Sequence, residues 1–329
     1  MPTSPNQKMK ALYLMKILEE RTDEDHTLTI SELIGALSEY GVVAERKSIY
    51  SDMEMLRHYG LDIEMRKSKK VGYYIASRRF ELPELKLLVD AVQSSRFITQ
   101  KKSNALIKKI SMLTSNHQAR ELNRQVFTVG RLKTRNESIY YNIDAIHTAI
   151  NSGRKIDFKY FDYDLKKERS YRKSGKVYSL TPLALCWNDD KYYLVCYSAK
   201  YDSFVNFRVD RMSDVSISDE NADKVDKKRF NVSEHIKHSF GMYSGEVVRV
   251  KLRFDNSLVN TVLDRFGADT SLYKCGDNCF EVNVEISESP VLFSWIAQFG
   301  SKAEILAPER LRKAMRDLVE ELNAMYNRK

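Results

Sequence analysis

The sequence predicts an α+β protein built from several domains, and three observations support this. The chain has 329 residues, more than one domain usually holds. Apolar residues recur at helical spacing in the first 151 residues and alternate at strand spacing from residue 155 onward. We therefore expect four parts, comprising residues 1–80, 81–140, 141–220 and 221–329.

The first 80 residues predict three short helices followed by a β-hairpin. The first helix is expected to pack through Met9, Leu12, Tyr13 and Ile17. Residues 29–32 have the form of a capping box that opens the second helix, and Gly41 ends it. The third helix spans residues 44–59 and buries Ile49, Met53 and Leu56. In the hairpin, alternating apolar residues flank a polar turn at residues 67–70: Ile63, Met65, Val71, Tyr73 and Ile75.

This order of elements is that of a winged helix-turn-helix and predicts binding to double-stranded DNA. The third helix would enter the major groove, and a basic hairpin beside it would contact phosphates. The side chains expected to face the groove are Arg46, Lys47, Ser48, Tyr50 and Ser51. Those expected on phosphates are Lys67, Lys69 and Lys70. The alternative is a small helical domain with a charged exterior.

The distribution of charge is compatible with a polyanionic partner. The formal net charge is +9, and residues 81–140 carry 11 basic residues against 5 acidic ones. Residues 66–79 contain six basic residues and no acidic one. We expect residues 83–115 to be helical, as a spacer or a dimer-forming pair, and a further helix at residues 143–151.

Residues 155–212 predict a small antiparallel β-barrel. Residues 156–160, 177–180, 183–187, 191–197 and 204–212 each have the character of a short strand. Residues 188–190 are a turn signal between two of them.

Three motifs within these strands resemble the WYL domain. They are Thr-Pro-Leu at residues 181–183, Tyr-Tyr-Leu-Val at residues 192–195 and Phe-Arg-Val-Asp-Arg-Met at residues 207–212. The Trp-Tyr-Leu triplet that names the family is replaced here by Tyr192, Tyr193 and Leu194, which keeps an aromatic residue at the first position. Residues 48–53 and 72–74 are similar to the family's DNA-binding portion, and residues 247–329 resemble the C-terminal extension that often follows a WYL domain.

The resemblance implies a cytoplasmic, bacterial, homodimeric transcription regulator, either a repressor or an activator. Its WYL domain would be a ligand-sensing barrel of Sm or SH3-like fold, followed by an α+β C-terminal domain. Family members sense nucleotides or nucleic acids, and some control phage-defence or DNA-damage genes. We expect an anionic effector to contact Tyr160, Tyr192, Tyr193, Arg208 and Arg211, because guanidinium groups bind phosphate and tyrosine rings stack on bases.

Strand alternation refines the expectation for the two arginines. Arg208 points away from the core if Phe207 and Val209 fill it. Arg211 either lies near the strand end or pairs with an acid such as Asp210 or Asp214.

Other kinds of site find little support in the sequence. No phosphate-binding glycine loop, nucleophile elbow or His-Glu-x-x-His helix occurs. We expect no catalytic site, no metal, no cofactor, no membrane span and no signal peptide. The four cysteines are expected to be reduced thiols, with Cys275 and Cys279 framing a plain hairpin turn. The alternatives are a nucleic-acid-processing enzyme and a constitutive DNA-binding adaptor whose barrel senses nothing.

Overall fold

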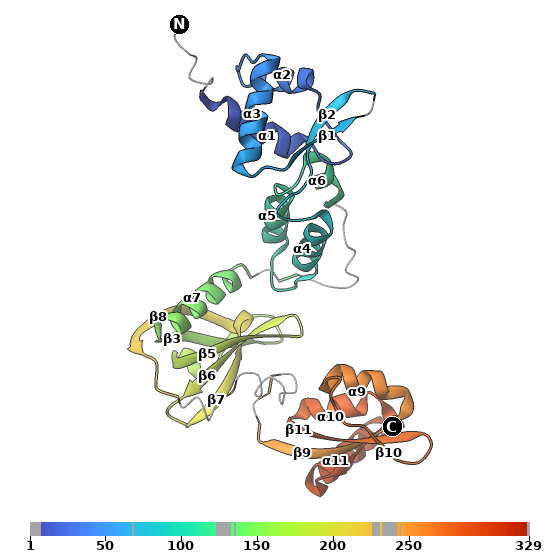
Figure 1. The fold of residues 1–329 in the computed structure, drawn as a ribbon. Coiled ribbons are helices and arrows are strands. Elements are labelled where there is room, and N and C mark those ends of the chain that lie inside the picture. The colour runs from blue at the N-terminus through green and yellow to red at the C-terminus, as the bar shows by residue number, and fades with distance from the viewer. Residues whose placement is uncertain are drawn as a thin grey trace. The chain divides into compact units, whose positions relative to one another are not determined.

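The computed structural model describes residues 8–67, 69–122, 133–134, 136–225, 231, 242–243 and 245–327. The chain divides into two compact units, Met1–Glu137 and Ser138–Lys329. The first unit consists of helices and one hairpin, and the second contains two antiparallel sheets with helices (Figure 1). The protein is therefore of mixed α+β type, as the sequence predicts.

The first unit begins with the predicted three helices and hairpin. They are α1 (Lys10–Arg21), α2 (Ile30–Ser38), α3 (Arg46–Tyr59), β1 (Ile63–Lys67) and β2 (Val71–Ile75). The capping box is confirmed, since Thr29 Oγ1 accepts from the backbone N–H of Glu32 while Glu32 accepts from the N–H of Thr29. Gly60 ends α3 with a φ of 111°, which a residue with a Cβ rarely adopts.

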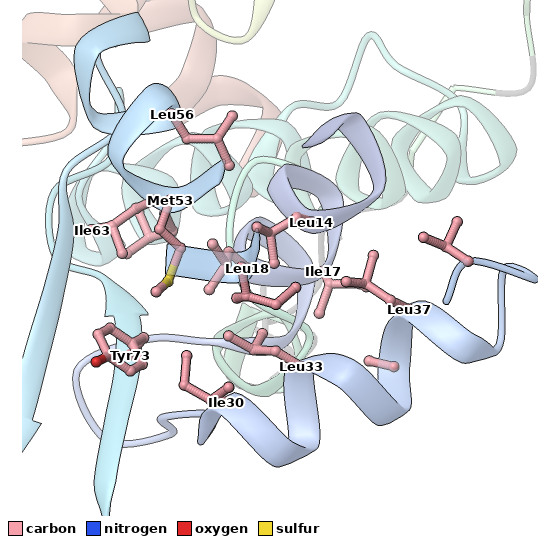
Figure 2. Packing of buried hydrophobic residues seen from close by; sticks show 14 residues of the cluster. Leu14, Ile17, Leu18, Ile30, Leu33, Leu37, Met53, Leu56, Ile63 and Tyr73 are labelled. Atoms are coloured by element: carbon pink, nitrogen blue, oxygen red, sulfur yellow. The ribbon is translucent and has the colours of Figure 1, made fainter. Parts of the chain in front are cut away.

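A single core joins these elements (Figure 2). Ile49, Met53 and Leu56 of α3 are buried in it, as predicted. The predicted apolar face of α1 is wrong in part, because the buried residues are Leu14, Ile17 and Leu18. Met9 and Leu12 are exposed, since the face of α1 that packs against α2 and α3 carries Leu14, Ile17 and Leu18 instead.

The hairpin is anchored to the core through Ile63, Tyr73 and Ile75. Ile63 pairs with Ile75 and is buried, whereas Met65 and Val71 are exposed. The backbones of Leu28 and Tyr73 exchange hydrogen bonds of 3.0 and 2.8 Å, so the segment before α2 lies beside β2. Ser68, in the predicted turn, lies outside the described residues.

Three further helices complete the described part of the first unit: α4 (Leu82–Ser94), α5 (Gln100–Ser111) and α6 (Asn116–Leu122). The expectation of helix throughout residues 83–115 is therefore wrong at residues 95–99 and 112–115. The first break occurs because Ser95 is extended and Thr99 caps a new helix, accepting from the N–H of Lys102 at 3.2 Å.

A buried polar joint ties α6 to the three-helix core. The Asp23 side chain is buried; one carboxylate oxygen accepts from Ser115 Oγ, and the other lies 2.7 Å from His26 Nδ1. The His26 ring stacks on His117 with centroids 3.7 Å apart. Burial raises the pKa of Asp23, but hydrogen bonds from Ser115 and His26 outweigh it, so the net pKa is lowered and the carboxylate stays charged.

The second unit begins with α7 (Ser138–Ser152) and a curled antiparallel sheet. Its strands are β3 (Arg154–Tyr163), β4 (Arg169–Tyr171), β5 (Tyr178–Asn188), β6 (Lys191–Ser198), β7 (Ser203–Arg208) and β8 (Met212–Asn221). The strands are paired in the order β8, β3, β5, β6, β7. The short strand β4 pairs with the last residues of β3, after the part of β3 that pairs with β5. Helix α7 packs on β3, β5 and β8.

Three details of the sheet differ from the prediction. The strands predicted at residues 177–180 and 183–187 are the single strand β5. Residues 204–212 are not one strand, because a 3₁₀ turn at Val209–Arg211 separates β7 from β8. Over residues 136–225, no ladder joins β7 to β8, so the sheet is a half-barrel rather than a closed one. The turn after Asn188 is confirmed: Asp189 and Asp190 both have positive φ, the conformation of a two-residue hairpin turn.

The C-terminal part of the second unit has its own core. The sheet order is β10 (Tyr273–Lys274), β11 (Cys279–Ser287), β9 (Val247–Asp255) and β12 (Ala303–Ala307). Its helices are α9 (Val259–Phe266), α10 (Pro290–Ala297) and α11 (Glu309–Tyr326). This part is α+β, as the resemblance implies. Val250, Leu252 and Phe254 of β9 form the centre of the core.

The expectation of four free thiols is wrong for one pair. Cys275 and Cys279 form a disulfide across the turn between β10 and β11, because the hairpin ladder brings their Cα atoms to 5.2 Å. Cys186 and Cys196 are free and buried. Within the described ranges, no helix combines the length and apolar character needed to cross a membrane.

Replacing Gly72 with Ala is expected to destabilise the first unit. The added Cβ would lie 2.1 Å from Thr27 Oγ1 and 2.6 Å from Thr27 Cβ. Such overpacking lowers the free energy of unfolding by about 1–3 kcal/mol. The measurement is urea denaturation of the full chain, with hydrogen exchange of peptides from residues 10–75 to locate the effect.

Gly35→Ala is the matched control, because Gly35 is exposed within α2 and an added Cβ there meets nothing within 4 Å. Removing a helical glycine should raise the free energy of unfolding by roughly 0.5–1 kcal/mol. Equal stability of the Gly72→Ala variant and the parent would contradict the close approach of Thr27.

Candidate functional site

The outward side of α3 presents a cationic surface. Arg46, Lys47, Tyr50 and Ser51 are exposed, and Ser48 is partly exposed. The Arg46 guanidinium donates to Tyr50 Oη at 3.3–3.4 Å, and its carbon lies 5.9 Å from the centre of the Tyr50 ring. This bond lowers the pKa of Tyr50. The predicted groove-facing residues thus share one accessible surface.

Contacts with the core, with the hairpin and with α1 hold helix α3 in place. Ile49 and Met53 lie in the core, and the Tyr50 ring meets the edge of Tyr73 from β2 at 6.2 Å. Lys10 of α1 pairs with Asp52 at 2.9 Å. The helix is therefore fixed to α1 and to the hairpin, while its basic residues remain accessible.

Two glutamates near this surface could oppose a phosphate. Glu54 pairs with Arg57 at 2.9 Å, which offsets its charge, and Arg57 also donates to the carbonyl of Ile63. Glu45 precedes α3 and is exposed; its backbone carbonyl accepts from Ser48 Oγ at 3.0 Å.

The hairpin adds basic side chains beyond its anchored base. Lys67, Lys69 and Lys70 are exposed. Thr29 lowers the pKa of Glu32 through hydrogen bonds, and nearby Lys70 contributes further. The predicted phosphate-contacting residues therefore lie at the free end of the hairpin, near the start of α2.

A second cationic cluster lies on the curled sheet, around the buried ring of Tyr160. The backbone N–H of Arg208 donates to Tyr160 Oη at 3.3 Å, and burial raises the pKa of Tyr160. The guanidinium of Arg172 lies 5.1 Å from the ring centre. Arg208 points away from Phe207, which is buried, as strand alternation predicts.

Two carboxylates hold the guanidinium groups of this cluster. Asp162 accepts from Arg172 Nε at 2.6 Å and from Arg211 Nη1 at 2.7 Å. Asp210 accepts a two-pronged bond from Arg208, at 3.0 and 2.7 Å. The hydrogen bond from Arg172 is the main reason why the pKa of Asp162 is lowered. The partner of Arg211 is thus Asp162, not either of the acids considered from the sequence.

The two tyrosines of the WYL triplet lie on opposite faces of β6. Tyr193 pairs with Arg208 across the ladder and is partly buried, which raises its pKa. Tyr192 pairs with Trp187, and their rings meet edge to face at 4.8 Å. The structure therefore places Tyr160 near Arg208 and Arg211, sets Tyr193 opposite Arg208 on the ladder, and leaves Tyr192 on the other face of β6.

Sequence reasoning missed Arg172 and its neighbour Lys173. They begin a loop in which Lys173, Ser174 and Gly175 all have positive φ, with values of 51°, 54° and 77°. Lys173 Nζ lies 4.4 Å from the centre of the Tyr178 ring. Non-glycine residues in this conformation cost on the order of 1 kcal/mol each, and such strain is frequent at ligand sites. The run of basic residues from 169 to 176 was the available signal.

This geometry suits an anion better than a metal. Over the described ranges, no group of three or more His, Cys, Asp or Glu side chains could hold a metal ion. Guanidinium groups bind phosphate through paired N–H donors, and aromatic rings nearby offer stacking surfaces. Each guanidinium in the cluster already has a carboxylate partner, so an incoming phosphate would compete with that carboxylate.

Family models match two segments of the chain. Residues 141–217 match the WYL domain, and residues 246–322 match the WCX domain. No curated protein matches this sequence significantly.

Among solved structures, one similar chain is proteasome accessory factor B/C (PafBC) of Arthrobacter aurescens, with 19% identity and a TM-score of 0.29. The match covers 99% of this chain and 49% of that one, so this chain spans about half the length of PafBC. A CRISPR Cas-related protein matches with 18% identity and a TM-score of 0.39, over 74% of this chain and 72% of that one. The two family models, in this order, confirm the resemblance seen in the sequence: the chain carries a WYL domain followed by a WCX domain.

Proposed function

We propose that this chain is a transcription regulator that binds double-stranded DNA with its first unit and an anionic effector with its WYL domain. The single observation that carries the proposal is that α3 is buried on its apolar side and exposed on its basic side, in a chain that also has a WYL domain. Its apolar side fills a core shared with α1 and α2, and its other side presents Arg46, Lys47 and Tyr50 to solvent.

In this proposal the first unit acts as a winged helix-turn-helix. The N-terminal side chains of α3 contact base edges in the major groove, and the lysines of the hairpin contact phosphates. Base contacts give sequence preference, whereas phosphate contacts give affinity that depends on salt. The two sets of residues therefore have separable effects on binding.

The effector in this proposal is a nucleotide or a short single strand of nucleic acid. Its phosphates replace Asp162 and Asp210 as partners of the arginines, and its base stacks beside Tyr193. Asp210 and Arg211 belong to the 3₁₀ turn between β7 and β8, so exchanging their partners alters this turn. In a homodimer, such a change shifts the spacing of the two α3 helices and hence the affinity for paired half-sites.

The double variant Arg46→Ala/Lys47→Ala should weaken binding to the regulator's own promoter DNA by about 1–3 kcal/mol for each lost base contact. The measurement is fluorescence anisotropy with the promoter duplex and a scrambled duplex at one fixed salt concentration. Lys108→Ala/Lys109→Ala is the matched control, since it removes two adjacent exposed charges from α5. Equal weakening by both variants would show that α3 contributes only net charge.

The double variant Lys67→Ala/Lys69→Ala should weaken binding to both duplexes alike. The plot of log affinity against log salt concentration should become shallower by about one for each lost phosphate contact. A titration from low to moderate salt measures this slope. An unchanged slope would show that the hairpin lysines do not contact DNA phosphates. A loss of affinity for the promoter duplex alone would show that they contact bases instead.

Arg208→Ala should reduce binding of a short oligothymidylate to the purified chain by roughly tenfold or more, because a charge-assisted two-pronged bond is lost. Isothermal titration calorimetry measures the affinity. Arg316→Ala on α11 is the control, since it removes a guanidinium group that lies outside the cluster and is exposed. Retained binding in Arg208→Ala, together with an unchanged response of promoter binding to the oligonucleotide, would favour a constitutive DNA-binding protein.

A further inference from the structure

The four cysteines fall into two chemical classes. Cys186 and Cys196 are buried in β5 and β6, and burial raises the pKa of both thiols, which makes them poor nucleophiles. Cys275 and Cys279 are partly exposed at a surface turn and are joined to each other. Only the second pair is therefore accessible to a small redox partner.

The backbone positions this pair independently of the bond between the sulfur atoms. The ladder between β10 and β11 ends with Lys274 opposite Phe280, which places residues 275 and 279 at the mouth of the turn. The N–H of Cys275 donates to the carbonyl of Cys279 at 2.9 Å. Their Cα separation of 5.2 Å lies within the range that a disulfide spans.

A residue outside the hairpin supports the same turn. The backbone N–H of Asn256 donates to the carbonyl of Asn278 at 3.0 Å, and its side-chain Nδ2 donates to the carbonyl of Asp277 at 3.0 Å. Gly276 has a φ of 74°, which lets the chain reverse between the two cysteines. These contacts do not depend on sulfur, so the turn keeps the two thiols close when they are reduced.

We propose that Cys275 and Cys279 are a redox-responsive modification site whose reaction partner is a low-molecular-weight disulfide. One cysteine thiolate attacks the small disulfide, breaking its S–S bond and releasing one small thiol. The second cysteine thiolate then attacks the mixed disulfide and releases the other small thiol. The two cysteines lose two electrons and two protons, and the small disulfide is reduced to two thiols. Excess small thiol reverses both steps.

The element that the bond controls is β10. This strand has two residues and forms its only ladder, within the described ranges, with β11 at the edge of the sheet. With the disulfide closed, β10 cannot move far from β11. With the disulfide reduced, two residue pairs and the turn contacts hold it, so it opens more often. The core around β9 does not depend on the bond.

The test equilibrates the full chain in glutathione buffers that range from fully reducing to fully oxidising. Free thiols are then alkylated in denaturant and located by peptide mass spectrometry. Cys275 and Cys279 should change together in one two-electron transition, while Cys186 and Cys196 remain thiols throughout. Alkylation of the reduced, folded chain should modify only Cys275 and Cys279.

Two variants sharpen the outcome. Cys275→Ser should leave Cys279 forming a mixed disulfide with glutathione, and Cys186→Ala should keep the transition unchanged. Hydrogen exchange at Tyr273 and Lys274 should become on the order of tenfold faster on reduction, with no change in β9. The proposal is overturned if Cys275 and Cys279 stay unpaired in the most oxidising buffer, or if their bond survives the most reducing one.

Discussion

The proposed effector site depends on one electrostatic constraint, which is that the three guanidinium groups around Tyr160 are held beside one another by carboxylates. Asp162 bonds to both Arg172 and Arg211, and Asp210 bonds to Arg208. Charges of the same sign repel at these distances, so the acids are as much a part of the site as the bases. The carboxylates therefore offset most of the positive charge of the three arginines, and a bound anion would have to replace them as partners.

The proposed DNA-binding surface is built on a different principle. Its basic residues lie on the solvent side of a helix whose other side is apolar, so core packing rather than ion pairing sets their position. Helix α3 presents Lys47 and Ser51 to solvent because Ile49, Met53 and Leu56 are in the core. An extended duplex needs such an open surface, whereas a small ligand needs enclosed donors. The two proposed activities thus follow from two kinds of local structure.

The sequence predicts local structure better than contacts between distant segments. The capping box at Thr29, the buried spacing of α3 and the turn at Asp189 and Asp190 are encoded within a few residues, and all three are confirmed. The bond between Asp162 and Arg211 spans 49 residues, and no periodicity reveals it. The face of α1 could not be settled from its pattern, since apolar residues occur on more than one side of that helix.

The role of Arg172 was missed for a related physical reason. Arg172 begins a loop in which Lys173 and Ser174 both adopt the left-handed backbone conformation, and neither residue type favours that conformation. The disulfide was likewise hidden, because cysteines four residues apart pair only when a ladder reverses the chain between them.

The polar joint at Asp23 has a consequence for how the protein can be divided. Cutting the chain after residue 80 would remove Ser115 and the ring of His117, so Asp23 would lose a hydrogen-bond donor and His26 its stacking partner. A fragment of residues 1–80 should therefore be less stable than the same residues in the full chain. Helix α6 contributes to the stability of the part of the chain that carries α3.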